Sequence, residues 1–429
     1  MVAPEAMPSA ARSLFRLPSG PLDRLTLVGE VAVGLYVAGL LVESTLPAPL
    51  VVARSAIVAF VVATALLAAL GGTRSAGGEL VPGNPLAGAL AIGLGGLGVG
   101  LSTGAGLSAL PVEGASPSAL TGLAALLASL FVATAGTRWL FRPLRRWSRL
   151  AALPIWLEVI QFWLLPLFLA GLAAHAPHTP LRSADPAGVQ DVRFPAADGT
   201  VLAGWLTPGT NGRTVIVIPG GGATRDNTLG QSAVLVRNGY TVLDYDPRGV
   251  GESGGREMLF GWGWESDLTS AVDFLATRPG IDMDRVGVLG LSIGAQVAIA
   301  GAATDGRLRA VVAEGAWARV CGDLVFFGDD AQGLLNRYDH CAGWFLAGLL
   351  SAASEPVTLA RSATQLDTRP TLLIAADSYE EHAANESLRS ISPATIQLWE
   401  PVGASHTGAL WAYPHEWERR VIGFLDASL

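Results

Sequence analysis

Long apolar runs fill the first 174 residues of the chain and end abruptly there. From Leu22 to Ala174 the sequence consists of Ala, Leu, Val and Gly runs, whereas from about Ser183 polar and apolar residues alternate as in a globular domain. A helix needs about 20 mostly apolar residues to cross the hydrocarbon core of a bilayer. We therefore expect an α-helical transmembrane bundle over residues 22–174, a linker at 175–188, and a globular domain at 189–429.

Five segments are long and apolar enough to be transmembrane helices: residues 25–46, 50–70, 85–110, 118–139 and 152–174. The third contains the glycine-rich run AIGLGGLGVGLSTGAG. Because small residues let neighbouring helices approach closely, a packed core helix is one interpretation of this run, and a broken or re-entrant segment is the other. Three glutamates lie within or near these segments: Glu30, Glu43 and Glu158. Each is either a functional carboxylate or a structural one. In the structural interpretation, Glu30 and Glu43 lie toward the ends of a helix and Glu158 makes a polar contact inside the bundle.

Arginines in the connections between these segments predict their orientation. The N-terminal tail and the second and fourth connections contain arginine, at positions 12, 16 and 24, then 74, then 138, 142, 145, 146 and 149. The first and third connections contain none, although Arg54 lies just inside the second segment. Because cytoplasmic loops carry the arginine excess, we expect residues 1–21 to be a cytoplasmic tail. Five crossings then place everything after Ala174 on the outer side of the cell membrane.

The composition of the remaining chain excludes several functions. After residue 174 there are 18 arginines and 29 acidic residues, a net charge near −11, so nucleic acid is not an expected partner. The chain contains no lysine, which excludes Schiff-base chemistry. No cofactor or metal is expected. The expected partners are a small-molecule, lipid or peptide substrate and the membrane lipids, and the sequence does not indicate an oligomeric state.

Strands and helices alternate through the globular part. It begins with a predicted hairpin, VQDVRFPAADGTVLAGWLTP, with Asp198 and Gly199 at the turn. Apolar strands then alternate with helices, in the segments TVIVIPGGG, YTVLDYDPRGVG, RVGVLGLSIG, RAVVAEGAWA, PTLLIAADS and TIQLWEPVG. Strands that are apolar throughout and alternate with helices indicate a mostly parallel sheet covered on both faces. The expected fold is a doubly wound α/β domain.

Four motifs in this domain occur in a characteristic order: IPGGG (218–222), YDPRGVGES (245–253), GLSIG (290–294) and GASHTG (403–408). Together they resemble the α/β-hydrolase family. In that family the corresponding segments are the oxyanion loop, the turn after the fourth strand, the GxSxG nucleophile elbow and the loop with the catalytic histidine. Pro219 stands where the family often has histidine, so a bracing contact of that loop is not expected here.

The resemblance implies a serine hydrolase with a Ser-His-acid triad. Gly290 and Gly294 lack Cβ atoms, so strand and helix can come close enough to hold Ser292 in a strained turn. His406 is the expected base, because among the six histidines it alone follows a strand in a Gly-flanked loop. Asp246, Arg248 and Asp267 are expected to brace turns below the site.

The oxyanion hole and the acid follow from the same resemblance. The backbone amide of Ile293, with that of Gly221 or Gly222, is expected to bind the developing oxyanion. The acid lies in the segment AADSYEEHAAN. We name Glu380 first, with Glu381 and Asp377 as alternates.

An insertion at about residues 318–367 interrupts the alternation of strands and helices, at the position where family members carry a cap. Its aromatic residues suit either the roof of a substrate cleft or a surface packed on the membrane domain or outer leaflet. Trp262 and Trp264 lie either near the cleft or in the core. Cys321 and Cys341, the only cysteines, are expected to form a disulfide if the domain is outside the cytoplasm.

The leading hypothesis is a membrane-anchored serine hydrolase that acts on an ester, thioester or amide outside the cytoplasm. The alternative is a non-catalytic membrane sensor or scaffold with a hydrolase-like binding domain. A transporter is disfavoured because charges within the apolar segments are scarce.

Overall fold

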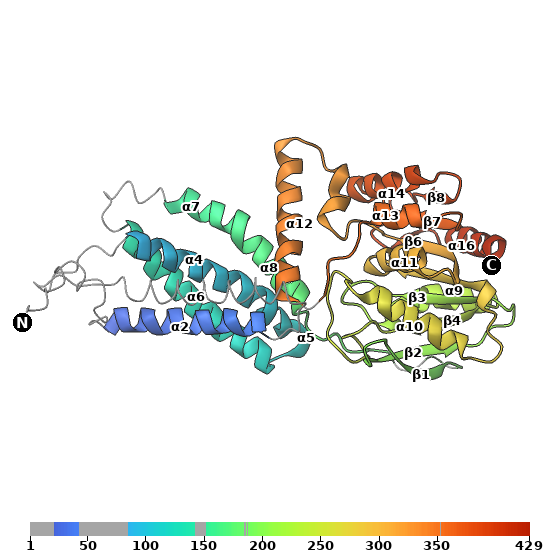
Figure 1. Ribbon diagram of the computed structural model, residues 1–429, viewed down its shortest axis with the longest axis horizontal. Coiled ribbons are helices and arrows are strands. Elements are labelled where there is room, and N and C mark those ends of the chain that lie inside the picture. Colours follow the sequence, from blue (N-terminus) through green and yellow to red (C-terminus); the bar gives the residue numbers. More distant parts are fainter. Residues whose placement is uncertain (1–20, 43–84, 142–151, 184–185, 187, 352) are drawn as a thin grey trace, which may run out of the picture. The chain divides into compact units, whose positions relative to one another are not determined.

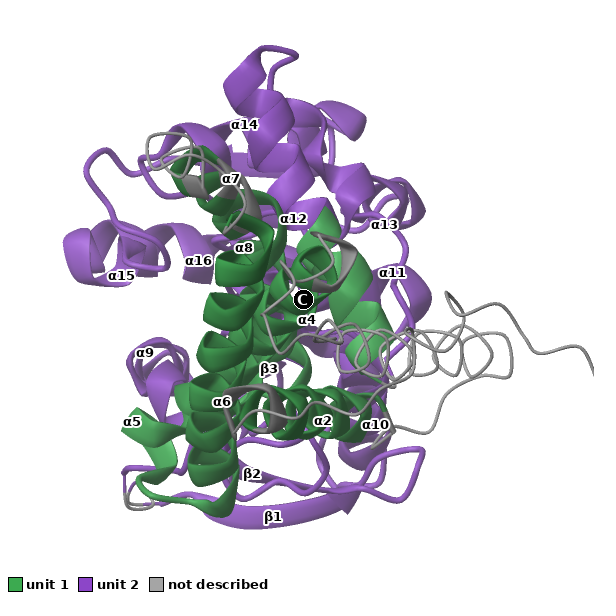
Figure 2. Ribbon diagram, turned by 90° about the vertical axis from the view of Figure 1, so that its left-hand side faces the viewer, with its two compact units in different colours: residues 1–177, 342–352 green, residues 178–341, 353–429 purple. Residues whose placement is uncertain are grey.

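The computed structural model describes residues 21–42, 85–141, 152–183, 186, 188–351 and 353–429. The chain forms two compact units. The first, here called the helical unit, contains Met1–Pro177 and Ala342–Ala352, and the second, the α/β unit, contains His178–Cys341 and Ala353–Leu429 (Figure 2). The described part of the first unit before residue 177 is helical, and the second contains the sheet (Figure 1).

The helices of the helical unit follow the predicted apolar segments. They are α2 (Pro21–Val42), α4 (Pro85–Leu101), α5 (Leu110–Glu113), α6 (Pro117–Phe141), α7 (Ala152–Val159) and α8 (Leu165–Ala174). Helical turns of π or 3-10 type join α4 to α5 (η1, Ser102–Gly106; η2, Leu107–Ala109) and α7 to α8 (η4, Ile160–Leu164). The predicted crossing at 50–70 and the cytoplasmic tail up to residue 20 lie outside the described residues.

Two helices in the described part of the chain are long and apolar enough to cross a membrane, Gly88–Glu113 and Pro117–Phe141. Shorter apolar helices cover Leu25–Leu41 and Ile160–Ala174. The glycine-rich third segment is therefore helical along its length, with a π turn, and the structure favours the packed-helix interpretation over a broken segment.

Small residues explain why the helices of this unit can pack closely. A Cβ added to Gly95 would lie 2.6 Å from the backbone nitrogen of Ala133, and one added to Gly104 would lie 2.2 Å from the carbonyl oxygen of Phe168. Such distances leave no room for a side chain, so glycine sets the spacing of α4 from α6 and of η1 from α8. Glu30 is fully buried in this unit, rather than reaching a helix end.

The α/β unit is built on an eight-stranded sheet with the order β1-β2-β4-β3-β5-β6-β7-β8. The strands are β1 (Gln190–Pro195), β2 (Val201–Thr207), β3 (Thr214–Ile218), β4 (Thr241–Tyr245), β5 (Val286–Leu291), β6 (Leu308–Glu314), β7 (Thr371–Ile374) and β8 (Ile396–Trp399). The pairs β1–β2 and β2–β4 are antiparallel and all the others are parallel. The predicted hairpin and mostly parallel sheet are both present, and Gly199 has the positive φ of +84° that its turn requires.

Helices cover both faces of this sheet (Figure 1). One apolar core lies under α10 (Trp264–Ala276), α11 (Ile293–Thr304), α13 (Leu359–Gln365) and α14 (Tyr379–Ile391). The other lies under α9 (Leu229–Arg237), α15 (Ala409–Ala412) and α16 (Pro414–Ser428). Parallel strands buried on both faces explain why β5 and, after Thr214, β3 contain only apolar residues and glycine.

The insertion after β6 contains η7 (Cys321–Phe326) and the long helix α12 (Ala331–Leu350). It is shorter than predicted, because Leu359 and Ala363 of α13 belong to the sheet core and not to a cap. Cys321 and Cys341 form a disulfide with 4.9 Å between their Cα atoms, which confirms the predicted pair. The disulfide ties η7 to the first half of α12.

Candidate active site

Ser292 occupies a sharp turn between β5 and α11. Its φ of 55° and ψ of −116° are strained for a residue with a side chain. Both flanking glycines are required by close contacts: a Cβ on Gly290 would lie 2.0 Å from the carbonyl oxygen of Gly294, and one on Gly294 would lie 2.4 Å from that of Ile218. The turn presents the Ser292 hydroxyl at the carboxyl edge of the sheet, where it is partly exposed.

His406 lies beside this hydroxyl, in the loop between β8 and α15. Its Nε2 atom is 2.8 Å from Ser292 Oγ, and its Nδ1 atom is hydrogen-bonded to Oε1 of Glu381. The histidine side chain is half exposed, whereas that of Glu381 is only 8% exposed. The structure thus joins a serine, a histidine and a buried carboxylate in one chain of hydrogen bonds.

The carboxylate in this chain is Glu381, the alternate, and not Glu380, which the sequence analysis named first. Helix α14 begins at Tyr379 with Ser378 as its N-cap, and Ser378 accepts a hydrogen bond from the amide of Glu381. Successive helical residues are about 100° apart, so only one of two adjacent glutamates can face His406. Glu380 is exposed instead. The second oxygen of Glu381 accepts from the amide of Ala376 at 2.8 Å.

Asp377, the other alternate, has a different partner. Its Oδ2 atom accepts a hydrogen bond from the amide of Gly403 at 2.8 Å, and its own amide donates to the carbonyl oxygen of Ala404 at 3.0 Å. Asp377 therefore holds the start of the loop that carries His406.

Glu381 controls the protonation of the histidine. The hydrogen bond and charge of Glu381 raise the pKa of His406 above its usual value, and burial opposes this only in part. A neutral His406 can accept a proton from Ser292 at Nε2, and the charge of Glu381 stabilises the imidazolium that forms.

Glu314, which the sequence analysis did not single out, fixes the other side of the histidine loop. It ends β6, and its buried carboxylate accepts hydrogen bonds from the amide of Ala409 at 3.0 Å and from Nε1 of Trp417 at 2.9 Å. Its carbonyl oxygen accepts from the amide of Ser292 at 2.8 Å. Burial raises the pKa of this carboxyl. One residue thus positions both the serine turn and the histidine loop, and its only sequence signal is an acid at the end of an apolar strand.

The loop after β3 lies next to the serine. A Cβ added to Gly220 would lie 3.2 Å from Ser292 Cβ. The amide of Gly222 donates to Oε1 of Glu257 at 2.7 Å, so it is already occupied. The amide of Gly221 has no hydrogen-bond partner within the described residues. Of the two glycines predicted for the oxyanion hole, the geometry favours Gly221, together with Ile293 at the first position of α11.

Glu257 takes the place of the bracing contact that Pro219 removes. It is almost fully buried, and its second oxygen has no hydrogen-bond partner in the described part of the chain. Burial raises the pKa of Glu257 to about 7, and the hydrogen bond from Gly222 opposes the shift. Nothing in the pattern around Glu257 predicts this contact, because its partner is 35 positions away.

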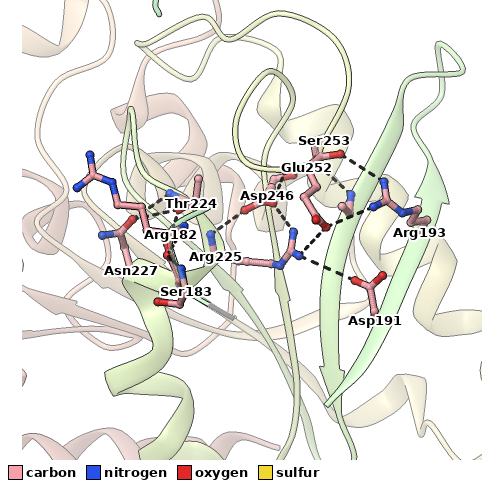
Figure 3. A network of polar contacts seen from close by, with 12 residues as sticks. Arg182, Ser183, Asp191, Arg193, Thr224, Arg225, Asn227, Asp246, Glu252 and Ser253 are labelled. Carbon is pink, nitrogen blue, oxygen red and sulfur yellow. Dashed lines mark hydrogen bonds and ion pairs between the residues drawn. The ribbon is translucent and has the colours of Figure 1, made fainter. Parts of the chain in front are cut away.

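A buried network of ion pairs supports the same loop from its far end (Figure 3). Arg225, three residues after Gly222, donates from its amide to Asp246 at 2.8 Å and forms an ion pair with the same carboxylate. Its guanidinium also contacts Glu252 at 2.8 Å and lies 4.4 Å from the centre of the Trp205 ring. Arg248 pairs with Asp267 at 2.6 Å. Asp246, Arg248 and Asp267 therefore brace turns, as expected, and do not contact Ser292.

Aromatic side chains gather in the insertion. The Trp317 ring lies 5.0 Å from the ring of His340, 5.9 Å from that of Phe326 and 6.3 Å from that of Phe327. Trp317 follows Gly315 by two residues, and a Cβ on Gly315 would lie 2.9 Å from Cε1 of His406. These four rings are here called the aromatic cluster, and its Trp317 comes two residues after the glycine beside His406.

The two tryptophans whose place was left open are both buried. Trp264 belongs to the sheet core, and Trp262 donates from Nε1 to the carbonyl oxygen of Arg319 at 3.1 Å, at the start of the insertion.

Among the residues that the structure describes, no group of three or more His, Cys, Asp or Glu side chains could hold a metal ion.

Comparison with known proteins agrees with this geometry. A family model described as X-Pro dipeptidyl-peptidase (S15 family) matches residues 175–411, more than half of the chain. A thiohydrolase of Eupenicillium brefeldianum is 36% identical over 128 residues, which cover 29% of this chain and 42% of that protein. A polyketide transferase of Aspergillus fumigatus is 35% identical over 127 residues, covering 29% and 44%. The chain spans less than half the length of these curated relatives.

Among solved structures, an esterase of Pyrococcus furiosus is 24% identical with a TM-score of 0.47, covering 58% of this chain and 98% of the esterase.

Proposed function

The chain belongs to the X-Pro dipeptidyl-peptidase (S15) family, and from that membership we propose that it is a membrane-anchored serine hydrolase that cleaves an ester, thioester or amide. One observation carries the proposal: Ser292, strained at its turn, is hydrogen-bonded to His406, which is hydrogen-bonded in turn to the buried Glu381. A serine hydroxyl needs a base to become a nucleophile, and a histidine needs an acid to fix its tautomer.

In the proposed first step, Ser292 Oγ attacks the carbonyl carbon of the substrate while His406 Nε2 takes the hydroxyl proton. The charge that develops on the carbonyl oxygen is stabilised by the amides of Ile293 and Gly221, each such donor lowering the barrier by about 3 to 4 kcal/mol. The imidazolium of His406, held by Glu381, then gives its proton to the leaving alcohol, thiol or amine. The product of this step is an acyl-enzyme on Ser292.

In the second step, water attacks the acyl-enzyme. His406 takes a proton from the water, the same two amides hold the second oxyanion, and the proton returns to Ser292 as the acid leaves. Apart from the substrate and water, both steps use only the groups of the chain named here.

The substrate class is supported by chemistry that the relatives' names share. A peptidase, a thiohydrolase and a polyketide transferase all require attack on an acyl carbon. This shared chemistry is why the proposal covers esters and thioesters as well as amides.

Membrane anchoring is supported by the exposure pattern of the helical unit. Its buried positions are mainly Ala, Gly and Ser, whereas large apolar side chains such as Leu35, Leu127 and Trp163 point outward, each more than 60% exposed. In water this arrangement would be unfavourable, but in a bilayer it lets small residues pack and large ones contact lipid. We propose that these helices, with residues 50–70, form a five-helix membrane domain.

We further propose that the N-terminus is cytoplasmic and the α/β unit lies outside the cytoplasm. The arginine distribution along the sequence supports this orientation. The disulfide between Cys321 and Cys341 also supports it, because disulfides persist in oxidising compartments.

Hydrolysis of a short-chain p-nitrophenyl ester by the purified full-length protein tests the proposed reaction. We expect turnover by the wild type and none above background for Ser292→Ala, with the same thermal unfolding midpoint. Turnover that survived in Ser292→Ala would exclude this serine as the nucleophile.

A further inference from the structure

The segment between β4 and α10 contains a short turn that lies against the oxyanion loop. In residues 258–261, here called the 258–261 turn, the amide of Gly261 donates a hydrogen bond to the carbonyl oxygen of Met258 at 2.7 Å. Leu259 and Phe260 are therefore the two central residues of the turn. Both are partly exposed, whereas Met258 is buried.

Contacts on both sides fix the position of this turn. Directly before it, the buried Glu257 accepts a hydrogen bond from the amide of Gly222 at 2.7 Å. At its end, Gly261 has a positive φ of +69°, and a Cβ added there would lie 2.3 Å from Cγ2 of Ile293. Only glycine lets the turn approach the start of α11 this closely. Leu259 is thus held between the oxyanion loop and α11.

The Leu259 residue contacts the backbone of the oxyanion loop. A Cβ added to Gly221 would lie 2.7 Å from the carbonyl oxygen of Leu259 and 3.3 Å from its Cδ1 atom. The same added Cβ would lie 3.0 Å from Cγ1 of Ile293, and one added to Gly222 would lie 3.6 Å from Cδ1 of Leu259. The side chains of Leu259 and Ile293 therefore meet against Gly221, the glycine whose amide is proposed to hold the oxyanion.

Solvent reaches each of the residues that surround this point. Gly221, Leu259, Ser292 and Ile293 are all partly exposed. An oxyanion lies about 3 Å from its donors, and the carbon next to the carbonyl of a substrate is only two bonds from the oxyanion. A substituent on that carbon is therefore close enough to contact side chains that lie against the donors.

The position of His406 decides which part of the substrate meets the 258–261 turn. The leaving atom must face His406, because His406 gives it a proton. The hydrogen-bond partners of His406 are Ser292 and Glu381, and both lie on segments other than this turn. The turn instead contacts Gly221 and Ile293, so we assign the acyl side of the substrate to it.

We propose that Leu259 is a specificity-determining residue that selects acyl groups without a branch at the carbon next to the carbonyl. The inference rests on the proposed hydrolase function and deepens it, because it names linear acyl derivatives as the substrate class. A methyl branch at that carbon competes for the space that Cδ1 of Leu259 occupies. A linear chain can turn away from this space.

Two isomeric esters test the selection. p-Nitrophenyl butyrate and p-nitrophenyl isobutyrate have the same leaving group and the same composition, and they differ only in the branch. We measure kcat/KM for each with the purified full-length protein and take the ratio of isobutyrate to butyrate. This ratio does not depend on the fraction of active enzyme, so a general loss of folding or activity does not move it.

Leu259→Ala should raise the isobutyrate-to-butyrate ratio about tenfold, because the variant has room for one more carbon. Leu259→Trp should lower the ratio, and it alone decides if Leu259→Ala does not fold. Leu259→Met has a similar side-chain volume and should stay within about twofold of wild type. Val201→Ala, at an exposed position of β2, is the control outside the site and should leave the ratio unchanged.

A second pair of esters varies the leaving group instead. p-Nitrophenyl acetate and phenyl acetate share their acyl group, so their kcat/KM ratio should be the same in Leu259→Ala as in wild type. An isobutyrate-to-butyrate ratio that did not rise in folded Leu259→Ala would overturn the inference. So would an equal change in the acetate pair, because Leu259 would then act on the leaving group. A wild type inactive on all four esters would instead contradict the hydrolase proposal itself.

Discussion

The two units use their apolar residues in opposite ways. In the α/β unit the buried positions are large, with Trp205, Ile216 and Trp417 fully enclosed. In the helical unit most buried positions are Ala, Gly or Ser, and leucines such as Leu127 face outward. Water drives large apolar side chains inward, whereas between helices in lipid the close packing of small residues is the main attraction. The second pattern is the one expected if the proposed membrane domain is correct.

The proposed function assigns catalysis to the hydrogen-bonded Ser292, His406 and Glu381 of the α/β unit, and the largest effect is expected there. Glu381→Gln should lower kcat by about 10³ to 10⁴, because the carboxylate that fixes the tautomer of His406 is lost. Steady-state kinetics on a p-nitrophenyl ester measures this. Glu380→Gln, one position away but exposed, is the matched control and should stay within twofold of wild type. A reversed result would return the role to Glu380.

The pH profiles of the wild type and of Glu381→Gln test the assignment of Glu381 further. His406 must be neutral to act as a base, so kcat/KM rises as pH rises through its pKa. Since Glu381 raises that pKa, the midpoint of the acid limb should lie above 6.5 in the wild type. Glu381→Gln should move the midpoint to lower pH, and a midpoint that did not move would separate Glu381 from His406.

The disulfide gives the next largest effect and also tests which side of the membrane the α/β unit occupies. Cys321→Ser/Cys341→Ser should lower the free energy of unfolding of that unit by about 3 kcal/mol, from the entropy of a closed loop of roughly 20 residues. Denaturant unfolding measures this change.

On intact cells, a membrane-impermeant maleimide should label the wild type only after reduction. Thiols that react only after lysis would place the α/β unit in the cytoplasm.

Close packing in the helical unit is tested by enlarging a glycine. Gly104→Ala should destabilise that unit by about 1 to 3 kcal/mol, because the new Cβ would meet the backbone of α8 and force the helices apart. Leu127→Ala, on the outward face, should leave stability in lipid within about 0.5 kcal/mol. Thermal unfolding in nanodiscs checks both. If Leu127→Ala were the more damaging change, the helical unit would have a core of the ordinary aqueous kind.

The smallest effect concerns the brace of the oxyanion loop. Glu257→Ala should lower kcat about tenfold with KM unchanged, because the Gly222 amide loses its partner and the neighbouring Gly221 amide is less well aimed. Glu257→Gln keeps an acceptor oxygen and should restore most of the rate. If only KM changed, or if kcat fell equally in both variants, Glu257 would not act through Gly222.

The parts of the site that follow from chain topology could be predicted from sequence. Ser292 and His406 sit in Gly-flanked turns after strands, and parallel strands deliver such turns to one edge of the sheet. The disulfide followed from the expected compartment. Ser292, His406 and the mostly parallel sheet needed no knowledge of side-chain packing.

The parts that depend on helix phase or distant contacts could not be predicted. Choosing Glu381 over Glu380 required the first residue of α14, and the pattern from Ser378 to Glu381 is a capping-box signal that would have supplied it. The hydrogen bond between Gly222 and Glu257 joins two loops, and no repeating pattern in the sequence relates their positions. The second half of α12 was assigned to a cap, although its uncharged run resembles the first 174 residues more than the domain around it.

The account's central claim is a serine nucleophile at position 292 on the outer side of a membrane. A membrane-impermeant fluorophosphonate applied to intact cells tests both halves of the claim at once. The account predicts that the 44.3 kDa wild type is labelled, that lysis adds no further label, and that Ser292→Ala is unlabelled at equal expression. Wild type labelled only after lysis, or Ser292→Ala labelled as strongly as wild type, would contradict it.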